Sequence, residues 1–332
     1  MTERQEVPLT RSPGPSPTYA LIDSGTTRSR VRLWRGGVIW EESLPVGAAA
    51  VAREGREVLR AGLESLLARA REQAALKGVS LDAVIASGMI SSNVGLYEVP
   101  HLPAPLSFAG LAAGTVPQEI PGLGLIHFIP GLRTTPDPGA ADPLAGLDVL
   151  RGEEVEVCGL RELLDLRGPA DFIHYGSHHK RVRTDEWGVL GSLTTLGGEL
   201  LAATIGHTVL ASSAVPPAEL GPPDEDWWSR GWRAAENGGY ARAAFCARLA
   251  DVRLGASPGQ VTSYLLGAVA QQDASLLAGD TPLVLYGHAT FTGPVGAWLA
   301  RQGRAVRVVD GPTGELAAPL GAVRLFEMSP YR

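Results

Sequence analysis

The chain contains the same strand–turn–strand pattern twice, once in each half. Residues 25–32 read Gly-Thr-Thr-Arg-Ser-Arg-Val-Arg, and residues 176–183 read Gly-Ser-His-His-Lys-Arg-Val-Arg. Each copy follows a short apolar run and begins an alternating one, which predicts two strands joined by a tight turn. Backbone N–H groups in such a turn form a concavity that suits phosphate. The repeat therefore favours a nucleotide held between two related domains over two ordinary turns.

Only the first copy carries a carboxylate just ahead of its glycine. This residue is Asp23, and the aligned position of the second copy is His174. A carboxylate at the end of a strand can hold Mg²⁺ directly or through water, because this ion keeps several of its waters. The alternative is a turn carboxylate that caps nearby amides.

The flanking sequence repeats the same order of elements. The first half predicts strands at 19–22, 31–35 and 38–42, a helix at 54–77 and a strand at 81–86. The second half predicts strands at 172–175, 180–183, 189–193, 283–286 and 305–309, with helices near 199–210, 261–277, 294–301 and 315–327. This order indicates a duplicated α/β unit with mixed sheets. Trp228 and Trp232 are one helical turn apart, which favours a packing role.

Length and composition fit two domains with a sizeable core. The 332 residues divide into a proline-rich tail (1–17) expected to be disordered, an N-terminal lobe (18–168) and a C-terminal lobe (169–332). The net charge of -6 gives no reason to expect nucleic acid. No apolar stretch reaches the roughly 18 residues of a membrane helix. Cys158 and Cys246 lack metal-site spacing, which favours free thiols in the cytoplasm.

This layout resembles the actin–hexokinase–Hsp70 superfamily, whose ribonuclease-H-like fold has two lobes of mixed sheet, flanked by helices, that close over ATP in a cleft. Residues 23–27 resemble its first phosphate motif, Gly176-Ser177 its second, residues 283–289 its adenosine motif and residues 317–322 its closing helix near the lobe interface. The resemblance implies ATP, Mg²⁺ on Asp23, and nucleotide contacts from Ser24, Gly25, Thr26, Thr27, Gly176, Ser177, His178, Lys180 and Gly287. His178 could instead be a structural residue, and Lys180 a solvated strand residue.

Residues 151–154, Arg-Gly-Glu-Glu, precede the predicted helix 155–163. Related sugar kinases have a Gly-Asp pair here, and its aspartate accepts the proton of the substrate hydroxyl. The match by position is Gly152-Glu153, which leaves open whether Glu153 or Glu154 is the base. The alternative is that both glutamates only interact favourably with the helix N-terminus.

Longer strings resemble the 2-dehydro-3-deoxygalactonokinase family. They are residues 87–95, the prolines between 100 and 105, and residues 129–132, 151–154 and 194–200. That family phosphorylates 2-keto-3-deoxy sugar acids on the C6 hydroxyl. The resemblance implies a substrate site with Gly88, Ser92, Asn93 and Arg151, in which Arg151 could hold the carboxylate. The alternatives are an ion pair of Arg151 with Asp148 or Glu154, and a loop in which Ser92 and Asn93 bond their own backbone.

One position departs from this family. Arg181 replaces the tryptophan of its second phosphate turn, which could change the packing behind the turn or the nucleotide preference. The expected function is a kinase of 2-dehydro-3-deoxygalactonate. A kinase of another sugar or sugar acid and a non-catalytic nucleotide sensor remain alternatives, as do the gluconate epimer as substrate and a homodimer as the assembly.

Overall fold

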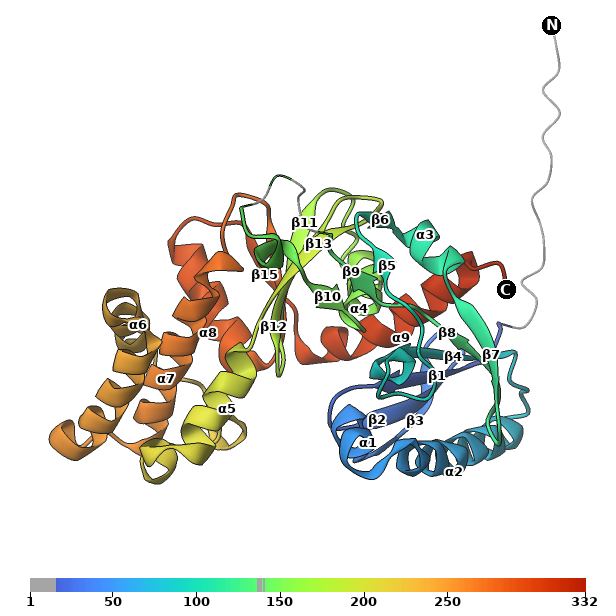
Figure 1. The fold of residues 1–332 in the computed structure, drawn as a ribbon, viewed down its shortest axis with the longest axis horizontal. Coiled ribbons are helices and arrows are strands. Elements are labelled where there is room, and N and C mark those ends of the chain that lie inside the picture. Colours follow the sequence, from blue (N-terminus) through green and yellow to red (C-terminus); the bar gives the residue numbers. More distant parts are fainter. Residues whose placement is uncertain (1–15, 136–138, 140) are drawn as a thin grey trace, which may run out of the picture.

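The computed structural model describes residues 16–135, 139 and 141–332. Most of the predicted tail lies outside these residues. Two mixed six-stranded sheets form the framework within them, and the lobes that they build are separated in Figure 1 by a gap between α5 (Gly197–His207) and α1 (Ala48–Glu54).

The first sheet has the order β3-β2-β1-β4-β8-β7. Its strands are β1 (Tyr19–Ser24), β2 (Ser29–Trp34), β3 (Val38–Leu44), β4 (Ala83–Gly88), β7 (Val116–Ile120) and β8 (Gly124–Phe128). β1 pairs antiparallel with β2 and parallel with β4. The helix predicted at 54–77 is α2 (Arg56–Leu76), and α1, which precedes it, was not predicted. The apolar stripe of α2 is buried against this sheet.

The second sheet repeats these relations in the order β15-β14-β11-β12-β13-β6. Its strands are β6 (Leu106–Ser107), β11 (Ala170–Tyr175), β12 (His179–Thr184), β13 (Gly188–Thr195), β14 (Leu283–Gly287) and β15 (Val306–Val308). β11 pairs antiparallel with β12 and parallel with β14, as β1 does with β2 and β4. The predicted duplication of a mixed α/β unit is therefore confirmed. The edge strand β6 comes from the first half of the sequence and pairs with β13.

The helices of the second half include one that the sequence did not predict. α6 (Glu225–Leu254) packs along α7 (Pro258–Gln272), and α8 (Ala289–Arg301) follows β14. Gly231 of α6 and Gly267 of α7 each lie against the backbone of the other helix. Trp228 and Trp232 are buried in this core, which confirms their packing role. α6 bends at Gly239, whose φ is 74°.

A small sheet and two long helices connect the halves. β9 (Leu132–Arg133) pairs with both β5 (Leu102–Pro103) and β10 (Val149–Leu150), and α3 (Phe108–Ala113) follows β6. β10 leads into α4 (Glu153–Leu163), which crosses the last helix, α9 (Gly311–Met328). At the crossing Gly159 lies against the carbonyl of Ala317, and Gly321 against that of Val155. The small residues of the closing-helix motif thus permit close packing of α9 on α4.

Among the described residues, no single helix is long and apolar enough to cross a membrane. The two bent segments Gly197–His207 and Val209–Glu219 are together long and apolar enough for a broken membrane span, by length and composition only.

Candidate active site

The first phosphate turn rests on the N-terminus of α1. The N–H groups of Ala48 and Ala49 donate to the carbonyls of Gly25 (3.1 Å) and Thr26 (2.8 Å). Gly47 makes this approach possible, because a Cβ there would be 2.6 Å from the Gly25 oxygen. The turn is therefore held through its carbonyls, and the Gly25 N–H donates to the Arg28 carbonyl within it (2.9 Å). The N–H and hydroxyl groups of Thr26 and Thr27 are left for a ligand.

The second turn is seated in the same way on α5. The Glu199 N–H donates to the Ser177 carbonyl (2.9 Å), and a Cβ on Gly198 would overlap the Gly176 carbonyl. The two turns are thus equivalent in their support as well as in sequence. Sequence reasoning did not single out Gly47 or Gly198, although a glycine at each of these helix starts was a visible signal.

Two further glycines occupy equivalent places beside the turns. Gly88 ends β4 with φ 81° and lies under the Ser24 carbonyl, and Gly287 ends β14 with φ 102° under the Tyr175 carbonyl. A side chain is excluded at both positions, because it would be strained and would meet backbone atoms. Gly88, predicted for the substrate loop, and Gly287, predicted for the adenosine site, therefore occupy equivalent positions in the two copies of the repeat.

Asp23 lies at the end of β1 with a partly exposed side chain. Its carboxylate has no hydrogen-bond or ion-pair partner among the described groups, so it does not cap nearby amides. Burial raises its pKa, and this effect is opposed by Arg32 and Arg30. An unengaged carboxylate at this edge fits a hydrated Mg²⁺, whose remaining ligands would be water and phosphate oxygens. The described residues contain no group of three acidic, histidine or cysteine side chains that could hold a metal alone.

The two glutamates at the start of α4 point in different directions. Both carboxylate oxygens of Glu154 accept the N–H of Gly152 at 2.9 Å, and only 1% of this residue is exposed. Burial, together with the charge of Glu153, raises the pKa of Glu154 to about 7. Glu154 therefore caps its own helix.

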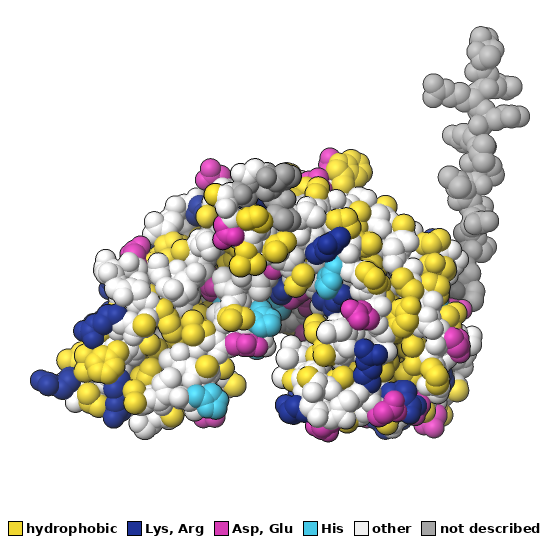
Figure 2. All heavy atoms as spheres, in the orientation of Figure 1, with side chains coloured by type: hydrophobic (Ala, Val, Ile, Leu, Met, Phe, Trp, Pro, Cys, Tyr) yellow, Lys and Arg dark blue, Asp and Glu magenta, His cyan; other side chains and the backbone are white. Residues whose placement is uncertain are grey.

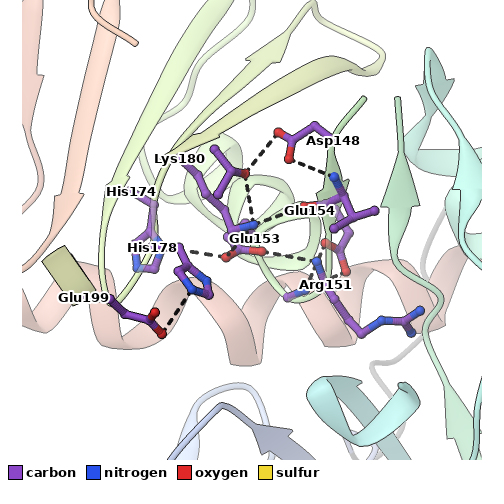
Figure 3. Close-up of polar contacts among 11 residues, drawn as sticks. Asp148, Arg151, Glu153, Glu154, His174, His178, Lys180 and Glu199 are labelled. Carbon is purple, nitrogen blue, oxygen red and sulfur yellow. Dashed lines mark hydrogen bonds and ion pairs between the residues drawn. The ribbon is translucent and has the colours of Figure 1, made fainter. Parts of the chain in front are cut away.

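Glu153 faces the second sheet (Figure 3). Its Oε1 lies 3.8 Å from Nζ of Lys180 and 3.9 Å from Nδ1 of His174, and its Oε2 accepts the N–H of Arg151 at 3.2 Å. Burial acts to raise the pKa of Glu153, but Lys180, His174 and the backbone N–H groups outweigh it, so the pKa is lowered. Glu153 is thus an ionised carboxylate at neutral pH.

Glu153 also lies close to the first phosphate turn. Gly152 has φ 126°, and a Cβ on it would be 3.6 Å from the Cα of Gly88. The charge of Glu153 contributes to the raised pKa of Asp23. The end of β4, the start of α4 and the end of β11 therefore meet. Figure 2 shows a notch between the two lobes.

The positions around the second turn separate into buried and exposed ones. His179 is fully buried, and its Nδ1 lies 2.6 Å from Oδ2 of Asp273. His178 remains partly exposed, with Nε2 3.2 Å from Oε1 of Glu199, so the two histidines face opposite ways. Arg181, in place of the expected tryptophan, forms an ion pair with Asp171.

Lys180 is not a solvated strand residue, because only 7% of it is exposed. Its Nζ donates to the carbonyl of Val149 (3.1 Å) and to Oγ1 of Thr194 (3.3 Å). Nothing in the local sequence indicated these partners.

The predicted substrate loop begins at Gly88 and passes through a 3₁₀ turn, Met89–Ser91. The Ser92 hydroxyl donates to the Met89 carbonyl (2.6 Å) and accepts the Val94 N–H (3.3 Å), which is the self-bonded arrangement. Asn93 is exposed, and its carbonyl accepts a bond from Arg56 (2.7 Å).

The guanidinium of Arg151 closes this loop. It donates to the carbonyl and hydroxyl of Ser91, to the Val99 carbonyl (3.0 Å) and to Nδ1 of His101 (3.1 Å). The alternative ion pairs with Asp148 and Glu154 are not formed. Burial and the charge of Arg151 lower the pKa of His101 to about 4, which keeps its ring neutral and able to accept at Nδ1.

Known proteins resemble the chain over most of its length. The model of a family described as 2-keto-3-deoxy-galactonokinase matches residues 23–324. A 2-dehydro-3-deoxygalactonokinase from Escherichia coli (strain K12) is 28% identical over 203 residues, which are 60% of this chain and 61% of that protein. The crystal structure of a candidate 2-dehydro-3-deoxygalactonokinase from Sinorhizobium meliloti superposes with a TM-score of 0.72 at 23% identity, covering 92% of this chain and 97% of that one.

Proposed function

Because the chain belongs to the 2-keto-3-deoxy-galactonokinase family, we propose that it transfers the γ-phosphoryl group of ATP to the C6 hydroxyl of 2-dehydro-3-deoxygalactonate. The products are ADP and 2-dehydro-3-deoxy-6-phosphogalactonate. The observation that carries the proposal is the position of the Glu153 carboxylate, between the end of β4 and the second phosphate turn and beside Lys180 and His174.

In the proposed reaction Glu153 accepts the proton of the C6 hydroxyl as its oxygen attacks the γ-phosphorus. The bond from phosphorus to the bridging oxygen breaks, and ADP takes the electron pair. Catalysis of this kind depends on positioning and on neutralising charge. Mg²⁺ bound at Asp23 would offset charge on the phosphates. The N–H and hydroxyl groups of both turns would hold the phosphates, with His178 beside the second turn and adenosine against Gly287.

The sugar acid would lie against the loop that Arg151 holds. Gly88, whose side-chain position is taken by the Ser24 carbonyl, would set the course of the loop at the end of β4, and Asn93 offers an amide side chain. Ser92 shapes the loop through its hydroxyl. Arg151 supports the substrate site by joining the two ends of the loop, Ser91 and Val99, to the segment that carries the base. The free thiols of Cys158 and Cys246 are in keeping with a reducing cytoplasm.

The test is ADP formation with Mg-ATP and 2-dehydro-3-deoxygalactonate, beside the gluconate epimer and a control without sugar acid. Turnover with the galactonate form is expected. Glu153→Gln is expected to lower kcat by about 10²–10⁴-fold while ATP still binds. Glu154→Gln is the matched control and should retain most of the activity, because Glu154 faces its own helix. ATP binding without turnover on either acid would favour another substrate or a nucleotide sensor.

A further inference from the structure

The chain uses lysine very sparingly. Only two of its 29 basic residues are lysines, Lys77 and Lys180. Lys77 is exposed at the end of α2, whereas Lys180 is buried between the two halves. A compact ammonium differs from the guanidinium used elsewhere, because it acts as a point charge with three donors that can be shared among separate acceptors.

The contacts of Lys180 converge on one short segment, residues 148–153. Its Nζ donates to the carbonyl of Val149 and lies 3.8 Å from Oε1 of Glu153. Its third partner, Thr194, donates in turn to Oδ2 of Asp148 (3.0 Å). Figure 3 shows this network between β12 and the segment that enters α4. A residue three positions after the second phosphate turn thus holds both ends of the segment that carries the base.

We propose that Lys180 is a positioning residue for the base rather than a phosphate ligand: its ammonium, fixed on Val149 and Thr194, orients the Glu153 carboxylate and keeps it ionised. The inference rests on the proposed function in treating Glu153 as the base. Its geometric part, the Lys180–Glu153 pair, is independent of turnover.

The charges around Glu153 make its ionisation depend on the pairing with Lys180. Its surroundings include His174 from β11 and Tyr286 from β14, and His174 is neutral because burial lowers its pKa to about 4. Three other carboxyl groups also act there: Asp23 from β1, and Glu154 and Glu156 from α4. Among these neighbours Lys180 supplies the positive charge. Without it, Glu153 would be buried among acidic groups and would take up a proton.

The first test is the pH dependence of kcat/KM. The acid limb reports the ionisation of the base, and loss of an adjacent opposite charge raises a carboxyl pKa by about 1–3 units. Lys180→Met is therefore expected to move the acid limb to higher pH by that amount, with activity regained at alkaline pH and KM for ATP changed less than about twofold. Lys180→Arg should restore part of the shift, and Lys77→Met is the matched control. A raised KM for ATP with an unmoved acid limb would overturn the proposal.

The second test needs neither turnover nor a substituted Lys180. Protein labelled with ¹³C-lysine gives two sets of side-chain signals, and Lys77→Met identifies those of Lys180. We expect the Lys180 ¹³Cε signal to follow an acidic titration step that disappears in Glu153→Gln and to move little when ATP is added. A signal that ignores Glu153 and responds to ATP would refute the pairing. Failure of the proposed substrate alone would leave this result unchanged.

Discussion

Neighbouring glutamates at the start of α4 have opposite electrostatic surroundings. The pKa of Glu154 is raised to about 7, whereas that of Glu153 is lowered. A carboxyl whose folded pKa is raised binds its proton more tightly in the folded state. Stability from Glu154 is therefore fully present below its ordinary pKa and is lost as the pH rises through about 7. The lowered pKa of Glu153 acts in the opposite sense, with a contribution lost as the pH falls.

We predict that Glu154→Gln is more stable relative to the parent protein at pH 8 than at pH 5. The ionisation cost that the substitution removes is at most about 3 kcal/mol, from 1.4 kcal/mol per pKa unit. Urea unfolding at the two pH values measures the difference.

Glu153→Gln is the control for this prediction. It should lose stability relative to the parent at neutral pH, because it removes a carboxylate that Lys180 favours. Equal behaviour of the two variants would contradict the assignment of opposite surroundings.

The sequence identified both glutamates but could not choose between them. Consecutive helical residues point about 100° apart, and the pattern does not show which one faces the second sheet. The choice depends on the backbone turn at Gly152 and on β12, whose Lys180 is far away in the chain. The role of Lys180 was hidden for the same reason, since Val149 and Thr194 become its neighbours only through sheet pairing.

At the scale of elements, each phosphate turn depends on a glycine at the start of the helix beneath it. Gly198→Ala would push a Cβ into the carbonyls of Gly176 and Ser177 and displace the second turn. We predict a rise in KM for ATP of about tenfold or more, since displacements of about 1 Å in a site can cost up to 10²-fold.

Gly206→Ala in the same helix is the matched control. A Cβ there meets nothing within 4 Å, so ATP binding should be unchanged and the helix slightly more stable, by about 0.5–1 kcal/mol. Equal effects of the two substitutions on KM would show that the turn does not rely on this close approach.

Helices and strands with a clear apolar periodicity could be predicted from the sequence. Short strands that form only by pairing with distant strands could not. The strands of the repeat and α7, α8 and α9 follow apolar periodicity, so the duplicated fold could be predicted. The two-residue strands β5, β6, β9 and β10 exist only through long-range pairing. α6 was missed because Gly238 and Gly239 interrupt its pattern, and the structure shows a bend there.

At the scale of the whole molecule, the crossing of α4 and α9 joins the base helix to the last helix. Gly321→Ala would force a Cβ against the Val155 carbonyl and separate the two helices. We predict a loss of about 1–3 kcal/mol in the free energy of unfolding, as for other overpacked contacts. Thermal or urea denaturation checks this.

Gly314→Ala, near the start of α9, is the control because its Cβ would lie in open space. An unchanged unfolding free energy for Gly321→Ala would show that the crossing tolerates separation.

The strand β6 has a further consequence for the molecule as a product of duplication. Leu106 and Ser107 belong to the first half but complete the sheet of the second, while α9 returns from the second half and packs on β1 and β4 of the first. Each half therefore depends on an element that the other half supplies. The two halves still match in their phosphate turns and glycines, but neither half can complete its fold alone. A chain cut at residue 168 should therefore yield two fragments that are recovered together or not at all.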